Sequence, residues 1–126
     1  MPITTKIKKQ ISFIHSKGAG TLTLGDLETH HCLFVNNPSI YGYNEILDLS
    51  SADLSALNHT EVLTVAETVS SSNAYDPKSK LAIILKTKQQ EEVINLYQLA
   101  RTFSDNPCRS MLTFYSHNDA MKWISN

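Results

Sequence analysis

Apolar runs of strand length alternate with amphipathic runs of helical period along this chain. Residues 81–85 (LAIIL) are the clearest strand, and their unbroken apolarity favours a central strand shielded by helices above and below. Residues 45–49 form a second apolar run, followed by polar residues and a helical pattern. Strands that alternate with helices are typical of α/β proteins with parallel strands. We therefore expect a single layer of sheet with helices on its faces.

The start of the chain predicts a different pairing. Two β-prone runs, residues 3–8 and 11–15, are separated only by Lys9 and Gln10, and so short a connection joins antiparallel neighbours. Residues 18–20 (GAG) interrupt the second run, so we expect the strand to resume beyond a bulge or bend. At the other end of the chain, residues 111–115 predict the last strand.

Four helices are predicted by capping residues and by apolar side chains at helical spacing. Thr23 and Asn58 each precede an acidic residue three positions later, the spacing of a capping box. The third helix is expected over residues 88–103, and Ser116 begins a short final helix. Each helix ends at short polar residues or a proline. The buried side of the third helix should carry Val93, Leu96, Tyr97, Ala100 and Phe103.

The composition indicates one soluble domain. The chain has 126 residues, of which 41% are hydrophobic, and a net charge of −1, so we expect residues 1–126 to form one domain around one core. No nucleic-acid partner is expected, because that surface would need an excess of Lys and Arg. Cys32 and Cys108 are interpreted as reduced thiols, with a long-range disulfide as the alternative. The chain shows neither a signal-peptide core nor an apolar run of membrane-spanning length, so we predict a cytoplasmic protein.

Catalytic and metal-binding signatures are missing from the sequence. Residues 30–32 (HHC) are consecutive, and successive side chains on a helix are turned by about 100°, so they do not converge on one metal ion. No nucleophile elbow, phosphate-binding loop or dinucleotide-binding motif occurs. His15, His59 and His117 are candidate general bases, but no spacing links them to an acid and a nucleophile. We therefore predict a protein that is not an enzyme and needs no cofactor or metal.

Asp48, Ser50 and Asp53 are the first candidate ligand-binding group. They follow the predicted strand at residues 45–49, and α/β proteins bind ligands at the carboxyl ends of strands. The alternative is that they hydrogen-bond the backbone of an irregular loop.

Tyr97 and Arg101 are the second candidate group. They lie one helical turn apart and share a face. The guanidinium can hold an anionic head group while the ring lines an apolar slot. The alternative is that Arg101 extends from the edge of the core and pairs with Asp105.

The order of elements resembles the SpoIIAA-like family of the STAS fold (sulphate transporter and anti-sigma-factor antagonist). Four motifs carry the resemblance: residues 20–27 (GxxTLxDL), 44–49 (NEILDL), 100–103 (ARxF) and 119–124 (DAxxWI). The resemblance implies a mixed sheet of four or five strands flanked by about four helices. It also implies a non-enzymatic regulatory or binding role in a bacterium, with a small ligand or with a membrane surface.

Anti-sigma-factor antagonists carry a phosphorylatable serine at the start of the second helix. The corresponding residues 57–61 (LNHTE) hold no serine, which leaves Thr60 as the candidate for phosphorylation. The adjacent Glu61 would repel the added charge. This difference argues against a phosphorylation switch in the present chain.

We predict a small binding or regulatory module that takes an apolar or amphiphilic ligand, or a peripheral membrane contact, between the second and third helices. The alternative is a protein-interaction switch related to the antagonists. Its partner, another protein or a second copy of the chain, would contact the surface of residues 53–61. An enzyme, the third class, would need a pocket that joins a histidine to an acid.

Overall fold

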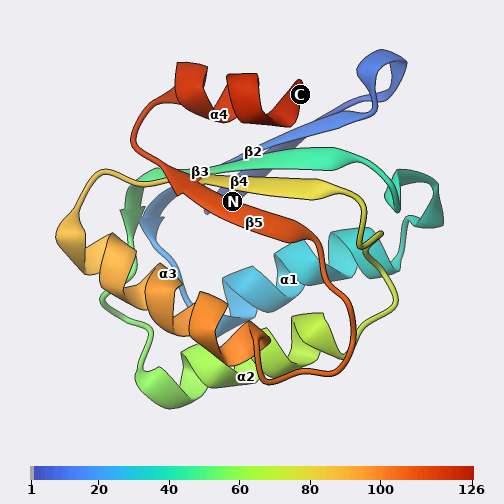
Figure 1. Ribbon diagram of the computed structural model, residues 1–126. Coiled ribbons are helices and arrows are strands. Elements are labelled where there is room, and N and C mark those ends of the chain that lie inside the picture. The colour runs from blue at the N-terminus through green and yellow to red at the C-terminus, as the bar shows by residue number, and fades with distance from the viewer. Residues whose placement is uncertain (1) are drawn as a thin grey trace.

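The computed structural model describes residues 2–126 as one five-stranded sheet covered by helices on both faces (Figure 1). The strands are β1 (Ile3–Lys8), β2 (Phe13–Thr21), β3 (Asn44–Asp53), β4 (Lys80–Ile84) and β5 (Ser110–Phe114). Their order in the sheet is β1-β2-β3-β4-β5. Strands β1 and β2 are antiparallel, and each of the other neighbouring pairs is parallel. The predicted mixed α/β sheet is therefore confirmed.

Three helices cover one face of the sheet and the fourth covers the other (Figure 1). They are α1 (Leu24–Val35), α2 (His59–Ser70), α3 (Lys88–Arg101) and α4 (His117–Ile124). Short 3₁₀ turns, η1 (Lys9–Ile11) and η2 (Pro38–Ile40), complete the elements. Helices α1, α2 and α3 each connect two parallel neighbours as the sheet advances in one direction. Because such crossovers share one hand, all three helices fall on the same face.

The predicted helix starts are confirmed by the capping geometry. The Thr23 hydroxyl accepts a hydrogen bond from the backbone N–H of Asp26, and Asn58 does the same for Glu61; both boxes are reciprocal. Ser116 caps α4. Helix α3 also has a reciprocal box, which begins at Thr87. Each cap satisfies amides that the helix itself leaves unpaired, a contribution of about 1 kcal/mol.

Strand β2 bends where the GAG sequence occurs. The pairing of β2 with β3 shifts register between Lys17 and Ala19, so the predicted bulge is confirmed. A Cβ atom at Gly18 would lie 3.0 Å from Cδ2 of Leu49, and Gly20 has a φ of +68°. The two glycines thus permit a close approach and a left-handed backbone within this bend.

Strand β4 is the central strand that the sequence predicts. Leu81 and Ile83 belong to the cluster under α1–α3, whereas Ala82 and Ile84 belong to the cluster under α4. All four side chains are at most 5% exposed. Both faces of the strand are therefore shielded from solvent, which explains its continuous apolarity.

The ends of β3 and of α3 differ from the prediction. Strand β3 continues to Asp53, so Asp48 and Ser50 lie within the strand and not after it. Helix α3 ends at Arg101, and the ring of Phe103 is 81% exposed instead of buried. The helical period of the apolar side chains simply continues two residues beyond the last helical turn, because spacing alone does not mark where a helix ends.

Candidate functional site

A buried carboxylate lies at the centre of a polar cluster beneath α1. Glu45, on β3, is 1% exposed. Its Oε2 accepts a hydrogen bond from Oγ of Ser16 at 2.9 Å and lies 2.7 Å from Nε2 of His30, while its Oε1 accepts from Nη1 of Arg109 at 2.9 Å. Burial opposes ionisation, but the charges and hydrogen bonds of His30 and Arg109 outweigh it and lower the pKa of Glu45 to about 2. Glu45 is therefore ionised at neutral pH.

The guanidinium of Arg109 packs against two aromatic rings that also contact each other, with their centroids 4.9 Å apart. Its central carbon lies 4.4 Å from the ring centroid of Tyr75 and 5.0 Å from that of Phe34. Arg101 donates a hydrogen bond to the backbone carbonyl of Arg109. These contacts, with the bond to Glu45, fix the plane and direction of the guanidinium.

His31 and Tyr75 extend the cluster. Nδ1 of His31 lies 2.6 Å from the Tyr75 hydroxyl, and the two rings stack with centroids 5.6 Å apart. Burial lowers the pKa of His31, and the charges of His30 and Arg109 act in the same direction. Burial raises the pKa of the Tyr75 hydroxyl. Both side chains are therefore neutral at neutral pH.

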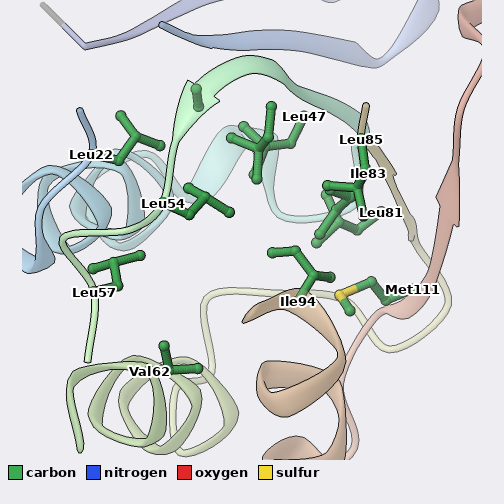
Figure 2. Close-up of a cluster of buried hydrophobic side chains, with 12 residues drawn as sticks. Leu22, Leu47, Leu54, Leu57, Val62, Leu81, Ile83, Leu85, Ile94 and Met111 are labelled. Carbon is green, nitrogen blue, oxygen red and sulfur yellow. The ribbon is translucent and has the colours of Figure 1, made fainter. Parts of the chain in front are cut away.

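A partly enclosed cavity of about 90 Å³ adjoins this cluster, between the sheet and α1–α3. Figure 2 shows apolar side chains pointing into this interior from both layers, among them Leu47 and Ile83 from the sheet, Val62 from α2 and Ile94 from α3. The polar lining residues are His30, His31, Glu45, Tyr75, Tyr97 and Arg109. The apolar lining residues are Leu27, Leu47, Leu49, Leu54, Leu57, Val62, Val65, Val69, Leu81, Ile83, Val93 and Ile94.

Of the residues predicted to bind a ligand, Tyr97 lines this cavity and Arg101 does not. Nη1 of Arg101 donates to Oε1 of Gln98 at 3.0 Å, and its guanidinium carbon lies 6.0 Å from the Tyr97 ring centroid. The side chain that Arg101 bonds is therefore Gln98 and not Asp105, the alternative partner expected from the sequence. The cation at the cavity is Arg109.

Asp48, Ser50 and Asp53 lie away from the cavity lining. The backbone N–H and the hydroxyl of Ser50 donate to Oδ1 of Asp48 at 2.9 and 2.6 Å. Oδ1 of Asp53 accepts from the backbone N–H of Ser55 at 2.9 Å. Side chains alternate along a strand, so Asp48 shares the α4 face of β3 with Ile46, opposite Leu47 and Leu49. The structure therefore does not bring the two predicted groups together.

The remaining candidates are distributed over the surface. Thr60 is exposed in the first turn of α2. Nε2 of His15 and Nε2 of His117 lie 3.2 Å apart on the α4 side of the sheet. Both cysteines are free thiols. Among residues 2–126, no three His, Cys, Asp or Glu side chains are placed to hold a metal ion.

The sequence reasoning missed the polar cluster. His30 was considered only as a possible metal ligand, and Glu45 and Arg109 were not singled out. A signal for Glu45 was present: it alternates with Ile46 and shares the face of Leu47 and Leu49. A carboxylate in that register must be buried, and a buried charge needs partners.

Comparison with known proteins shows the fold. The structure matches an uncharacterised protein of the DUF3478 family with a SpoIIAA-like fold, from Shewanella loihica PV-4. The match has a TM-score of 0.56 and 20% sequence identity, and covers 97% of this chain and 93% of that chain. The chain thus has the SpoIIAA-like fold that the resemblance predicted. No protein-family model and no curated protein matches the sequence. Within residues 2–126, every helix is too short or too polar to cross a membrane.

Proposed function

We propose that this protein is a non-catalytic binding module that holds a small apolar or amphiphilic ligand in the cavity beneath α1–α3. The observation that carries the proposal is the composition of the cavity wall: twelve apolar side chains, with polar groups confined to the cluster around Arg109. An apolar wall supplies affinity through the hydrophobic effect, and a few polar groups fix the orientation of the ligand.

The size of the cavity limits what it encloses without rearrangement. A cavity of about 150 Å³ accommodates benzene, so a volume of about 90 Å³ encloses roughly four non-hydrogen atoms. The opening of the cavity allows the remainder of a longer ligand to lie between the helices or outside. Short aliphatic chains are therefore the appropriate probes.

The electrostatics of the cluster support a binding role rather than a catalytic one. With a pKa of about 2, Glu45 is a weak proton acceptor at neutral pH. Its two oxygens already have three partners. Glu45 therefore acts as the counter-ion that positions Arg109. This role supports ligand binding, and not proton transfer, as the function of the site.

Filling the cavity tests the proposal. Val65 lines the cavity from α2 and is 8% exposed, so Val65→Phe places additional atoms inside it. The matched control is Val35→Phe at the end of α1, where the valine is 49% exposed. The probe is 1-hexanol, and the readout is the shift in melting temperature on adding it to each variant.

A saturating probe at 100 times its Kd stabilises a protein by about 2.7 kcal/mol, which raises the melting temperature of a domain of this size by roughly 10 °C. We expect such a dose-dependent shift for the wild type and for Val35→Phe, and its loss in Val65→Phe. Val69→Leu, a milder filling variant on α2, should reduce the shift if Val65→Phe folds poorly. An unchanged shift in both filling variants, or no shift in the wild type, would contradict the proposal.

A further inference from the structure

The polar end of the cavity contains hydrogen-bond donors that the protein leaves unused. Within residues 2–126, the guanidinium of Arg109 has one acceptor, Oε1 of Glu45, which bonds Nη1. Its Nε and Nη2 donors have none. In this part of the chain, Nε of Arg101 is the one side-chain nitrogen or oxygen that is fully buried and has no hydrogen-bond partner, so the two donors of Arg109 do not belong to that class. The free donors of Arg109 are therefore not fully buried, and Arg109 is one of the residues that line the cavity.

Tyr97 lines the same cavity and adds a third donor. Its side chain lines the cavity, and its hydroxyl makes no hydrogen bond with residues 2–126. Burial raises the pKa of this hydroxyl, and the charges of Arg101 and Arg109 act in the opposite direction. The hydroxyl thus stays protonated at neutral pH and can donate to an anion beside Arg109.

The free edge of the guanidinium has a defined shape. Nε–H and Nη2–H point in parallel from one side of the planar group, and their spacing matches the two oxygens of a carboxylate. Contact of the guanidinium with the rings of Tyr75 and Phe34, together with its bond to Glu45, holds this edge in place before any ligand arrives. A preorganised donor pair loses less entropy on binding than a mobile one.

We propose that the ligand is a short-chain carboxylic acid, whose carboxylate binds the free edge of Arg109 and the hydroxyl of Tyr97 while its alkyl chain enters the apolar cavity. This inference rests on the proposed function and names its ligand class. Glu45 occupies the other side of the guanidinium, so Arg109 would bridge two carboxylates. A cationic head group is disfavoured here by the charge of Arg109, and an alcohol offers one acceptor where the guanidinium edge has two donors.

A matched series of probes tests the head group without any mutation. The probes are hexanoate, 1-hexanol, hexylammonium and hexyl phosphate, which share one alkyl chain and differ in the polar end. Affinity is measured by titration followed in ¹H–¹⁵N NMR spectra, because weak binding remains measurable there. We expect hexanoate to bind at least about tenfold more tightly than 1-hexanol, and hexylammonium to bind more weakly than either. Hexyl phosphate can also present two oxygens to the guanidinium edge, but it should bind more weakly than hexanoate, because its larger and more highly charged head group costs more to remove from water beside the carboxylate of Glu45.

Two variants locate the carboxylate. Tyr97→Phe removes the hydroxyl and should weaken hexanoate binding several-fold with little effect on 1-hexanol. Tyr115→Phe is the matched control, since the Tyr115 ring is 64% exposed and its hydroxyl donates to Glu91. Arg109→Lys keeps the charge but loses the paired donors, and should reduce the preference for hexanoate over 1-hexanol to a few-fold.

The outcomes separate this inference from the proposed function. If hexanoate and 1-hexanol bind the cavity equally, or if hexylammonium or hexyl phosphate binds best, the carboxylate inference is wrong while the binding module stands. If no probe perturbs the resonances of cavity residues, both fail. If hexanoate binds preferentially but equally in wild type and Tyr97→Phe, the assignment of Tyr97 is overturned.

Discussion

Replacing Glu45 by glutamine tests whether an ionised carboxylate holds the buried cluster together. The pKa of Glu45 is lowered from 4.5 to about 2 in the folded protein. That difference of about 2.5 pKa units corresponds to roughly 3 kcal/mol. Because the folded pKa lies below the unfolded one, this stability is fully present above pH 4.5. It is lost as the pH falls towards 2, where the folded protein also binds the proton.

The Glu45→Gln variant resembles the protonated carboxyl at every pH. We therefore expect its free energy of unfolding to be about 3 kcal/mol lower than that of the wild type at pH 7. At pH 3 the difference should be only about half as large. Urea unfolding, followed by the fluorescence of the single tryptophan, measures both differences; Trp123 packs against Phe114 in the core under α4. The urea midpoints and slopes give the free energies of unfolding.

Glu28→Gln is the matched control for this experiment. Glu28 is exposed on α1, the helix that carries His30, so the same loss of charge should change stability by less than about 0.5 kcal/mol. A Glu45→Gln variant within 1 kcal/mol of wild type at pH 7 would refute the reasoning. So would a difference between the two proteins that does not shrink on acidification.

Two further predictions concern the surroundings of the cluster. NMR titration should place the pKa of His31 below its ordinary value of 6.5, because burial disfavours the charged ring. Acidification from pH 6.5 down to that lowered pKa should then destabilise the fold, since unfolded His31 binds the proton more readily; titration at or above 6.5 would contradict this. Leu54→Ala, at a cavity-lining residue that is 1% exposed, should lower the free energy of unfolding by 2–5 kcal/mol and increase the affinity for a longer alcohol such as 1-octanol. Leu112→Ala on β5, where the leucine is 47% exposed, should do neither, and equal effects of the two substitutions would argue against the cavity.

The elements that could be predicted from the sequence are those specified by neighbouring residues. A capping box needs two residues three positions apart, so Thr23 and Asn58 predicted the starts of α1 and α2 correctly. The buried strand β4 was predicted for the same reason, because the apolar residues 81–85 are consecutive and the first four of them belong to the strand. Local patterns were weaker at the ends of elements, as Phe103 shows: nothing in its spacing reveals that the helix has already ended.

The polar cluster could not be predicted because its members meet only through the sheet topology. Glu45 is 15 residues from His30 and 64 residues from Arg109 in sequence. The pairing of β3 with β4 and of β4 with β5 brings the segment before β5 to the side of Glu45. Tyr97 was chosen correctly as a cavity residue by its helical period, but the same reasoning paired it with Arg101, the nearest cation on its helix. Periodicity identifies the face of a helix, whereas the partner across the core depends on the order of strands.

The position of the cluster beside a cavity is difficult to explain by stability alone. At about 24 cal/mol per Å³, an unfilled volume of about 90 Å³ costs roughly 2 kcal/mol relative to a packed interior. A buried ion pair such as that of Glu45 and Arg109 often contributes no more than apolar residues of similar size would. Apolar side chains that filled the cavity and replaced the ion pair would therefore make a more stable protein. The present arrangement instead keeps a preorganised guanidinium with free donors next to an apolar space, and that combination favours ligand recognition as the reason for the site.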